Sequence, residues 1–411
     1  MARRHQAPKG TFDVLPADEP ARAAVSAAAS RRLRAAGYGR IETPIFEDTA
    51  LFERGVGEST DIVRKEMFTF TDQGGRSITL RPEGTAPICR AYVEHGMHRL
   101  AQPVKLSYEG PYFRYERPQE GRFREFNQIG AEAIGSASAM VDAELIILLA
   151  GIIADLGIAD AELRLSSLGS PEARAAYRDE LRAHLREHEA ELSSEVRDRI
   201  DANPLRAFDS DHAGTREVMS AAPRMLDRLD GADAEHFAEV RALLDAVDLP
   251  YTLDGTLVRG LDYYNRTVFE FTCERLGAQS GLGGGGRYDG LVELIGGPPT
   301  PAIGWAAGIE RILLAMEAPP APVAIDVFVV SGEAGPRAFA LVGELREAGI
   351  AADLDLAGRS FKGQMKQADR SGARHAVILE ADGTAKLRDM RSGEQREVEP
   401  AALAVELAAA R

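Results

Sequence analysis

The chain has very little cysteine: only Cys89 and Cys273 occur among its 411 residues. Two distant cysteines make no disulfide framework, and without a CxxC pair or a Cys/His quartet we expect no zinc site. The longest apolar run, residues 145–154, is too short to cross a bilayer, which takes roughly 20 residues. The basic N-terminus is not followed by the apolar core of a signal peptide. We therefore expect a cytoplasmic protein that does not associate with membranes.

Lysine is also scarce, with six residues against 43 arginines. We attribute this bias to base composition, because alanine is abundant too, so each arginine has to be argued from its position. The formal net charge of −15 excludes a global basic field that would attract nucleic acid. It does not exclude a local positive groove on an acidic protein.

The first part of the chain predicts a strand-rich catalytic domain. A helix over residues 17–36 precedes a strand at 40–45, a hairpin at 67–81 and a helix at 85–95. Longer strands follow at 104–115 and 123–134, and strands resume at 256–258 and 266–272. The strand order is not that of a parallel doubly wound fold, so we expect an α+β domain on a mostly antiparallel sheet.

The composition then changes twice. Residues 171–248 carry 19 Asp and Glu against 11 Arg and no Lys, which predicts an acidic helical insertion. After a proline-rich linker at 319–324, strands alternate with helices, which indicates a separate small α/β domain. We expect four parts: a discontinuous catalytic domain (1–170 and 251–318), a helical insertion (171–250), the linker and a C-terminal domain (325–411).

Residues 281–286, Gly-Leu-Gly-Gly-Gly-Gly, match the dinucleotide-binding pattern GxGxxG. That motif must open a βαβ unit, whereas this run follows an antiparallel region, so we reject a nicotinamide dehydrogenase. Two interpretations stay open: a flexible hairpin loop, or a place where a ligand approaches the backbone closely. A P-loop is absent from the sequence.

Alternation along residues 122–132 places two cations, an aromatic ring, an amide and a carboxylate on one strand face: Arg122, Arg124, Phe126, Gln128 and Glu132. This face is either the exposed side of a sheet or a ligand-binding surface. Neighbouring segments add further charged and aromatic residues: Arg81, Glu83, Arg114, Glu116, Arg259, Tyr263, Tyr264, Glu310 and Arg311. Such a set suits a polyphosphate nucleotide together with a substrate that bears an ammonium group.

Five motifs occur in the order found in one family. Residues 113–116 (Phe-Arg-Tyr-Glu) and 304–311 (Gly-Trp-Ala-Ala-Gly-Ile-Glu-Arg) resemble motifs 2 and 3 of class II aminoacyl-tRNA synthetases, and the Pro44 region resembles motif 1. Residues 259–264 (Arg-Gly-Leu-Asp-Tyr-Tyr) and 285–290 (Gly-Gly-Arg-Tyr-Asp-Gly) are similar to the two signatures of histidyl-tRNA synthetases, and 80–85 also fits. The resemblance covers essentially the whole chain.

The resemblance implies specific roles. The histidine amino group would be held by Glu83, Thr85 and Gln128, and the imidazole read by Glu132 and Tyr264, with Tyr263 nearby. ATP would be bound by Arg114, Glu116, Arg122, Phe126 and Arg311, and Arg259 would supply catalytic charge at the α-phosphate beside the histidine. Structural roles stay open for some of these and their neighbours: Thr85 as a helix cap, Tyr263 in the core, Arg81 in an ion pair, and Arg287 and Tyr288 as supports of the glycine run. We interpret Cys89 as a packing residue.

The implied reaction joins histidine to tRNA(His) through a histidyl-adenylate, with ATP as substrate, Mg²⁺ carried by ATP and a homodimeric enzyme. The C-terminal domain resembles an anticodon-binding domain, with a basic cluster around one helix: Arg359, Lys362, Lys366, Arg370 and Arg374. Arg117 and Gln119 are candidates for contact with the tRNA acceptor end.

Two alternatives remain within the same fold. A non-catalytic regulatory subunit of ATP phosphoribosyltransferase resembles this enzyme, but it generally lacks the anticodon domain and departs from the signatures. A synthetase for another amino acid is disfavoured by Glu132 and by the string 259–264.

Overall fold

The computed structural model describes residues 5–57, 60–257, 261–277, 280–320, 325–332 and 335–409. The chain divides into two compact units, Met1–Pro320 and Ala321–Arg411. In the first unit an eight-stranded sheet has the order β1-β5-β6-β11-β10-β9-β7-β8. Its strands are β1 (Gly39–Arg40), β5 (Val104–Phe113), β6 (Glu125–Ile134), β7 (Ala161–Ser167), β8 (Thr252–Leu253), β9 (Asn265–Cys273), β10 (Gly281–Arg287) and β11 (Ala302–Gly308).

The six central strands of this sheet pair antiparallel, and only the edge pairs β1/β5 and β7/β8 are parallel. The expected mostly antiparallel sheet is therefore confirmed. A second, three-stranded sheet joins β2 (Phe46–Asp48), β4 (Ser77–Leu80) and β3 (Phe68–Thr71). The expected hairpin is its β3/β4 pair. The strand expected at 40–45 is wrong over most of its length, since only residues 39–40 and 46–48 form strands; Pro44 between them has no N–H to donate.

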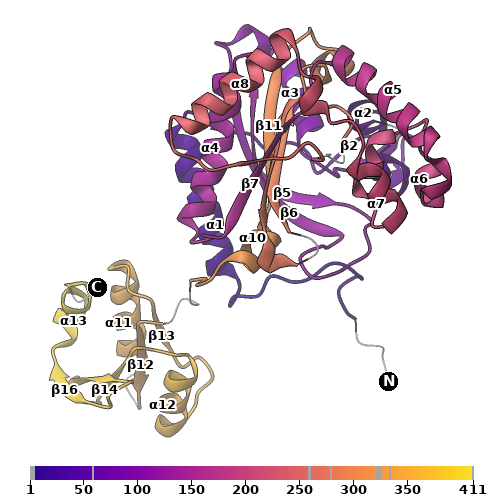
Figure 1. Ribbon diagram of the computed structural model, residues 1–411. Helices are drawn as coiled ribbons and strands as arrows, with labels where there is room; N and C mark the ends of the chain where they lie inside the picture. Colours follow the sequence, from indigo (N-terminus) through magenta and orange to yellow (C-terminus); the bar gives the residue numbers. More distant parts are fainter. Residues whose placement is uncertain are drawn as a thin grey trace. The chain divides into compact units, whose positions relative to one another are not determined.

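Helices cover both faces of the large sheet (Figure 1). On one face, α1 (Glu19–Ala35), α4 (Ala139–Asp155), α8 (Gly231–Asp245) and α10 (Ile309–Ala315) bury the largest apolar cluster against odd-numbered residues of β6 such as Ile129 and Ala131. On the opposite face lie α2 (Thr49–Val56), α3 (Thr85–Glu94) and α9 (Leu291–Leu294). The even-numbered residues of β6 are directed to this second side, since strand neighbours alternate.

The acidic segment forms α5 (Pro171–Glu187), α6 (Ser194–Arg197) and α7 (Ala213–Ser220), which build an apolar cluster of their own around Leu181 and Leu185. Short 3₁₀ turns at Glu189–Glu191 and Pro204–Asp209 connect them, and a further turn at Met225–Arg228 leads from α7 to α8. The following helix, α8, packs instead with the main cluster through Phe237, Val240 and Leu244. The segment is thus tied to the sheet at its C-terminal end.

The second unit has a five-stranded mixed sheet of order β13-β12-β14-β15-β16. Its elements are β12 (Val327–Ser331), α11 (Gly335–Glu347), β13 (Ala352–Leu354), α12 (Phe361–Arg370), β14 (His375–Leu379), β15 (Ala385–Asp389), β16 (Gln395–Val398) and α13 (Pro400–Ala409). Alternate residues of β12 face two apolar clusters, one with α11 and α13 and the other with α12. The expected α/β domain is confirmed, although β15, β16 and α13 were not expected.

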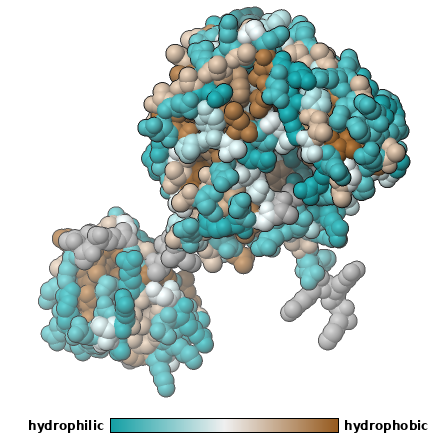
Figure 2. All heavy atoms as spheres, in the orientation of Figure 1, coloured by the Kyte–Doolittle hydropathy of each residue, from teal (hydrophilic) through white to brown (hydrophobic). Residues whose placement is uncertain are grey.

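The face in Figure 2 is mostly hydrophilic, with apolar residues in small scattered patches. Among the described residues, no helix combines the length and the apolar character that crossing a membrane requires.

Candidate active site

Two adjoining pockets lie on the α3 side of the large sheet. The first is lined by Ile62, Glu83, Gly84, Thr85, Tyr108, Arg114, Gln128, Leu261, Tyr263, Tyr264, Gly284, Trp305 and Ala306. The second is lined by Arg114, Glu116, Gly121, Arg122, Phe123, Phe126, Gln128, Glu270, Gly281, Leu282, Gly283, Ala306, Gly308, Glu310 and Arg311. Arg114 and Gln128 belong to both, so a ligand in one pocket would meet a ligand in the other beside these two side chains.

Glu132 lies behind the first pocket and is completely buried. Its carboxylate accepts hydrogen bonds from the hydroxyls of Tyr288 (2.6 Å), Thr85 (2.9 Å) and Tyr108 (3.2 Å). Burial raises the pKa of Glu132 to about 8, and the three hydroxyls only partly oppose this shift. None of these three partners is a cation. A ligand's N–H group could therefore donate a hydrogen bond to a carboxyl group whose pKa is raised.

A second buried carboxylate, Glu83, stands at the start of α3. It accepts hydrogen bonds from the main-chain amides of Thr85 (2.7 Å) and Ala86 (3.0 Å), which are otherwise unpaired donors of the first helical turn. Burial raises the pKa of Glu83, while those amides and Arg114 oppose the shift. Thr85 is the first residue of α3 rather than its cap, and its hydroxyl is turned to Glu132.

Gln128 carries an acceptor that has no partner within the described structure. Its Oε1 atom is buried and makes no hydrogen bond there. A buried polar atom without a partner costs about 1–3 kcal/mol, which a ligand's N–H group would relieve. The face of β6 that alternation predicted is therefore a pocket wall at Phe126 and Gln128, not an exposed surface.

The second pocket is rich in arginine. Arg122 forms an ion pair with Glu116 (3.2 Å), and Arg114 lies over the ring of Phe126 with its guanidinium carbon 5.4 Å from the ring centre. Arg114 is anchored by a hydrogen bond from Nε to the carbonyl of Pro82 (2.8 Å).

Arg311 closes the opposite wall. Its Nε atom donates to the carbonyl of Gly281 (2.7 Å) in β10. Burial, together with the charge of Arg122, lowers the pKa of Arg311. A polyphosphate bound between Arg114, Arg122 and Arg311 would supply negative charge to pair with these three cations. Within the described part of the chain, no group of three or more His, Cys, Asp or Glu side chains could hold a metal ion.

The glycine run is neither a flexible loop nor a dinucleotide-binding turn, because residues 281–287 form the central strand β10. Close packing explains part of its composition, and Gly281, Gly283 and Gly284 also line the two pockets. A Cβ on Gly285 would lie 1.9 Å from the carbonyl oxygen of Gly304, and one on Gly304 would lie 1.5 Å from Oε2 of Glu132. Gly304 therefore allows β11 to pack directly against the buried carboxylate of Glu132 on the neighbouring strand β6.

Arg81, Arg287 and Cys89 lie near the site, and each of them has a structural role. Arg81 is buried and donates to the carbonyls of Thr43 (2.8 Å) and Pro111 (2.9 Å), which joins the two sheets; its expected ion pair is replaced by these carbonyls. Arg287 is buried and bonds Asp142 on α4 (3.0 Å), which supports the end of the glycine strand. Cys89 is fully buried among apolar residues, so its packing role is confirmed.

The structure brings together every predicted site residue that it describes, from Glu83 to Arg311. Arg259 lies outside the described residues. Sequence reasoning missed Tyr108 and Tyr288 as partners of Glu132, and Glu270 in the second pocket. Tyr108 could have been found, because it lies on a strand next to the charged face; Tyr288 is brought in only by the fold.

Comparison with known proteins agrees with this geometry. A family model of histidyl-tRNA synthetase matches residues 10–312, and a model of an anticodon binding domain matches residues 324–409. The chain belongs to the histidyl-tRNA synthetase family. It is 48% identical over 401 residues to the histidine–tRNA ligase of Pelotomaculum thermopropionicum, covering 95% of this chain and 94% of that protein.

Solved structures of the family are similar as well. The apo histidyl-tRNA synthetase of S. aureus has a TM-score of 0.82 at 36% identity and covers 98% of this chain and all of its own. A Bacillus halodurans protein described as an ATP phosphoribosyltransferase regulatory subunit/histidyl-tRNA synthetase has a TM-score of 0.69 at 24% identity, over 93% of this chain and all of its own. At that identity the second likeness shows the fold alone.

Proposed function

We propose that this protein attaches histidine to tRNA(His) at the expense of ATP, through a histidyl-adenylate. The observation that carries the proposal is the pair of pockets that meet at Arg114 and Gln128. One is lined by Glu83 and three tyrosines, with Glu132 behind it, which suits an ammonium and an imidazole. The other is lined by arginines that suit a polyphosphate. Histidine–tRNA ligases at 48% identity support the same reaction.

In the first step the carboxylate of histidine attacks the α-phosphorus of ATP, and the bond to pyrophosphate breaks. Glu83 and Gln128 hold the ammonium group, which brings a positive charge to a buried carboxylate and a donor to an unpaired acceptor. Glu132 reads the imidazole, with Tyr263 and Tyr264 beside it. The hydrogen-bonded carboxyl favours an imidazole over an apolar ring, because an apolar ring would leave buried polar groups unpaired.

In the nucleotide pocket Phe126 and Arg311 sandwich the adenine, and Glu116 and Arg122 contact the adenine and the outer phosphates respectively. Arg114, at the junction, contacts the α-phosphate, where negative charge accumulates as pyrophosphate leaves. Arg259 supplies a second positive charge there. Each such preorganised contact typically lowers the barrier by about 2.7–4 kcal/mol. The nucleotide brings Mg²⁺ with it as part of the substrate.

In the second step a ribose hydroxyl of the tRNA 3′ end attacks the adenylate carbonyl, and AMP leaves. We assign recognition of the acceptor end to Arg117 and Gln119. The C-terminal unit binds the anticodon, with the exposed Lys362, Lys366 and Arg370 on α12 as phosphate contacts. The chain functions in the cytoplasm, where its substrates are made and used, with catalytic parts 1–170 and 251–318, the helical insertion 171–250, the linker 319–324 and the C-terminal domain 325–411.

The protein acts as a homodimer through its three-stranded sheet. Ile45, Phe46 and Phe70 expose 46%, 51% and 47% of their surface there, although all three are large and apolar. Contact with a second copy would remove this surface from water.

Histidine-dependent exchange of pyrophosphate into ATP, without tRNA, tests the proposal. We expect exchange with histidine and with no other amino acid. The Arg259→Ala variant is expected to lose it while remaining folded, because that charge acts mainly in the transition state. Folded protein that exchanges with no amino acid would favour the regulatory subunit, and binding to ATP phosphoribosyltransferase would then be measured.

A further inference from the structure

The helical segment reaches the first pocket through Arg174, near the start of α5. Its Nη1 atom donates two hydrogen bonds, to the main-chain carbonyls of Asp262 (2.8 Å) and Tyr264 (2.7 Å). These two carbonyls flank Tyr263, and both Tyr263 and Tyr264 line the pocket. One guanidinium thus spans the segment that presents both tyrosines.

The environment of Arg174 strengthens this contact. Burial lowers the pKa of Arg174, and the charge of the neighbouring Asp262 opposes the shift. A charged donor binds a carbonyl more strongly than a neutral one, and it does so most where water is excluded. Segment 261–264 is a turn and not part of a helix or strand, and the main-chain amide of Asp262 donates a long hydrogen bond to the carbonyl of Val56 (3.3 Å).

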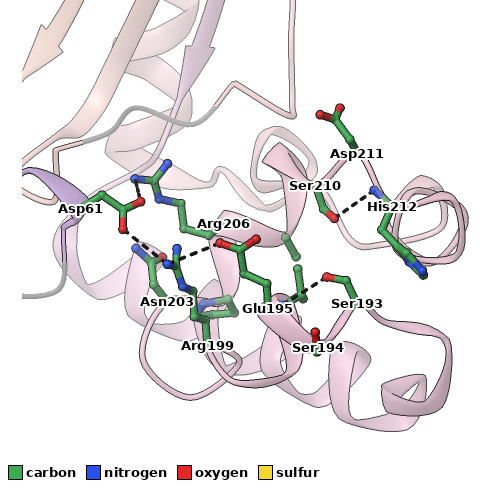
Figure 3. Close-up of a pocket in the computed structure, with 13 residues that line it drawn as sticks. Asp61, Ser193, Ser194, Glu195, Arg199, Asn203, Arg206, Ser210, Asp211 and His212 are labelled. Atoms are coloured by element: carbon green, nitrogen blue, oxygen red, sulfur yellow. Dashed lines mark hydrogen bonds and ion pairs between the residues drawn. The ribbon is translucent and has the colours of Figure 1, made fainter. Parts of the chain in front are cut away.

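The helical segment also contacts Asp61, the residue before Ile62 of the first pocket. The Asp61 carboxylate pairs with Arg199 and Arg206, each at 3.4 Å, across the polar cavity drawn in Figure 3. These pairs are partly exposed and long, so they contribute little by themselves. They show that the segment borders the site on two sides, with Arg174 as the stronger contact.

We propose that Arg174 is a positioning residue for histidine recognition. By holding both carbonyls that flank Tyr263, it fixes the 261–264 segment in the shape that presents Tyr263 and Tyr264 to the amino acid. The inference rests on the proposed function, because it takes the first pocket as the histidine site. It also gives the helical segment a role inside the adenylation step, separate from any contact with tRNA.

The test compares Arg174→Met, Arg174→Lys and the control Arg178→Met in pyrophosphate exchange. Arg178 lies one turn further along α5 and donates to the carbonyl of Ala202, away from the pocket. We expect Arg174→Met to raise the KM for histidine about tenfold or more, the size expected for losing a charged hydrogen bond. The KM for ATP should stay within about threefold, and Arg174→Lys should recover part of the loss. Arg178→Met should match the parent protein.

Deuterium uptake provides a readout that does not depend on activity. Arg174→Met should speed exchange of the main-chain amides in 261–268, while Arg178→Met should not. A parent protein without histidine-dependent exchange would refute the proposed function, and uptake would then decide whether Arg174 holds the segment. An unchanged KM for histidine in an active Arg174→Met variant, or unchanged uptake, would overturn the positioning role.

Discussion

Tyr288 donates a hydrogen bond of 2.6 Å to Glu132, a residue 156 positions earlier in the chain. The bond joins the end of the glycine strand to the buried carboxylate on β6. Two neighbouring strands thus shape the site: Gly304 on β11 leaves room for the Glu132 carboxylate, and Tyr288, which follows β10, orients it.

The raised pKa of Glu132 predicts a pH dependence of stability in the ligand-free protein. Below pH 4.5 Glu132 is protonated in both the folded and the unfolded chain, so its ionisation does not reduce the free energy of unfolding. As the pH rises towards 8 the unfolded chain ionises first, and the free energy of unfolding falls. Glu132→Gln removes this loss, so the difference between variant and parent should change by at least about 1.4 kcal/mol between pH 5.5 and 8.5.

Urea unfolding followed by the fluorescence of Trp305 checks this prediction. Trp305 is the only tryptophan and is buried in the main core, so its signal reports the catalytic unit alone. Parallel pH profiles for parent and Glu132→Gln would mean that Glu132 stays ionised in the folded protein.

Substitution of Gln128 should change histidine binding without lowering the stability of the folded protein. Because its Oε1 atom is buried without a partner in the described structure, Gln128→Met should leave the free energy of unfolding unchanged or raise it by up to about 1 kcal/mol. The KM for histidine should rise about tenfold. Gln102→Met is the matched control: its amide donates to Met97 (3.1 Å) and Leu100 (3.0 Å), so stability should fall with no change in KM. A Gln128→Met protein with normal KM would remove Gln128 from the histidine site.

The close approach at Gly304 predicts that Gly304→Ala lowers the free energy of unfolding by about 3 kcal/mol or abolishes folding. The added methyl group would collide with Glu132 and with the main chain at Ala131. Gly290→Ala is the control, since a Cβ there meets nothing within 4 Å, and its effect should stay within about 0.5 kcal/mol. Equal stability of the two variants, by Trp305 fluorescence, would contradict the packing argument.

Removal of residues 321–411 tests the division of labour between the two units. Because both pockets of the candidate active site lie within Met1–Pro320, the truncated protein should retain histidine-dependent pyrophosphate exchange within about threefold. Charging of tRNA(His) should fall at least about a hundredfold, since phosphate contacts dominate nucleic-acid affinity. Equal losses in the two assays would count against anticodon binding by the second unit.

The proposed dimer is tested at the three-stranded sheet. Phe46→Asp should shift the protein from dimer to monomer, because it puts a charge into an apolar contact. Phe339→Asp is the control, since Phe339 is 68% exposed on α11 in the other unit and should leave the mass unchanged. Light scattering after size-exclusion chromatography measures both. A parent protein that is already monomeric would refute the dimer.

The sequence alone predicted the sheet type, a separate C-terminal unit and most of the charged residues of the two pockets. Strand alternation in 122–132 was enough to place Phe126, Gln128 and Glu132 on one face, because neighbouring strand residues always point to opposite sides. Composition located the helical segment and predicted a linker at 319–324, where the chain divides into two units after Pro320; residues 321–324 lie outside the described residues. Local propensity was least informative at residues 281–286, where it left a loop and a close approach of a ligand both open. The residues form a strand: a Cβ on Gly283 or Gly285 would collide with β11, and Gly281, Gly283 and Gly284 also line the pockets.

Only the tertiary structure decided which face of β6 is a pocket, how Glu132 is held and where the helical segment meets the site. Tyr288 reaches Glu132, and Arg174 reaches Tyr264, through pairings of strands and helices that lie far apart in the chain. No local pattern encodes such contacts, because they follow from how the elements pack. The raised pKa of Glu132 has the same origin, since desolvation exists only once the core has closed around the carboxyl group.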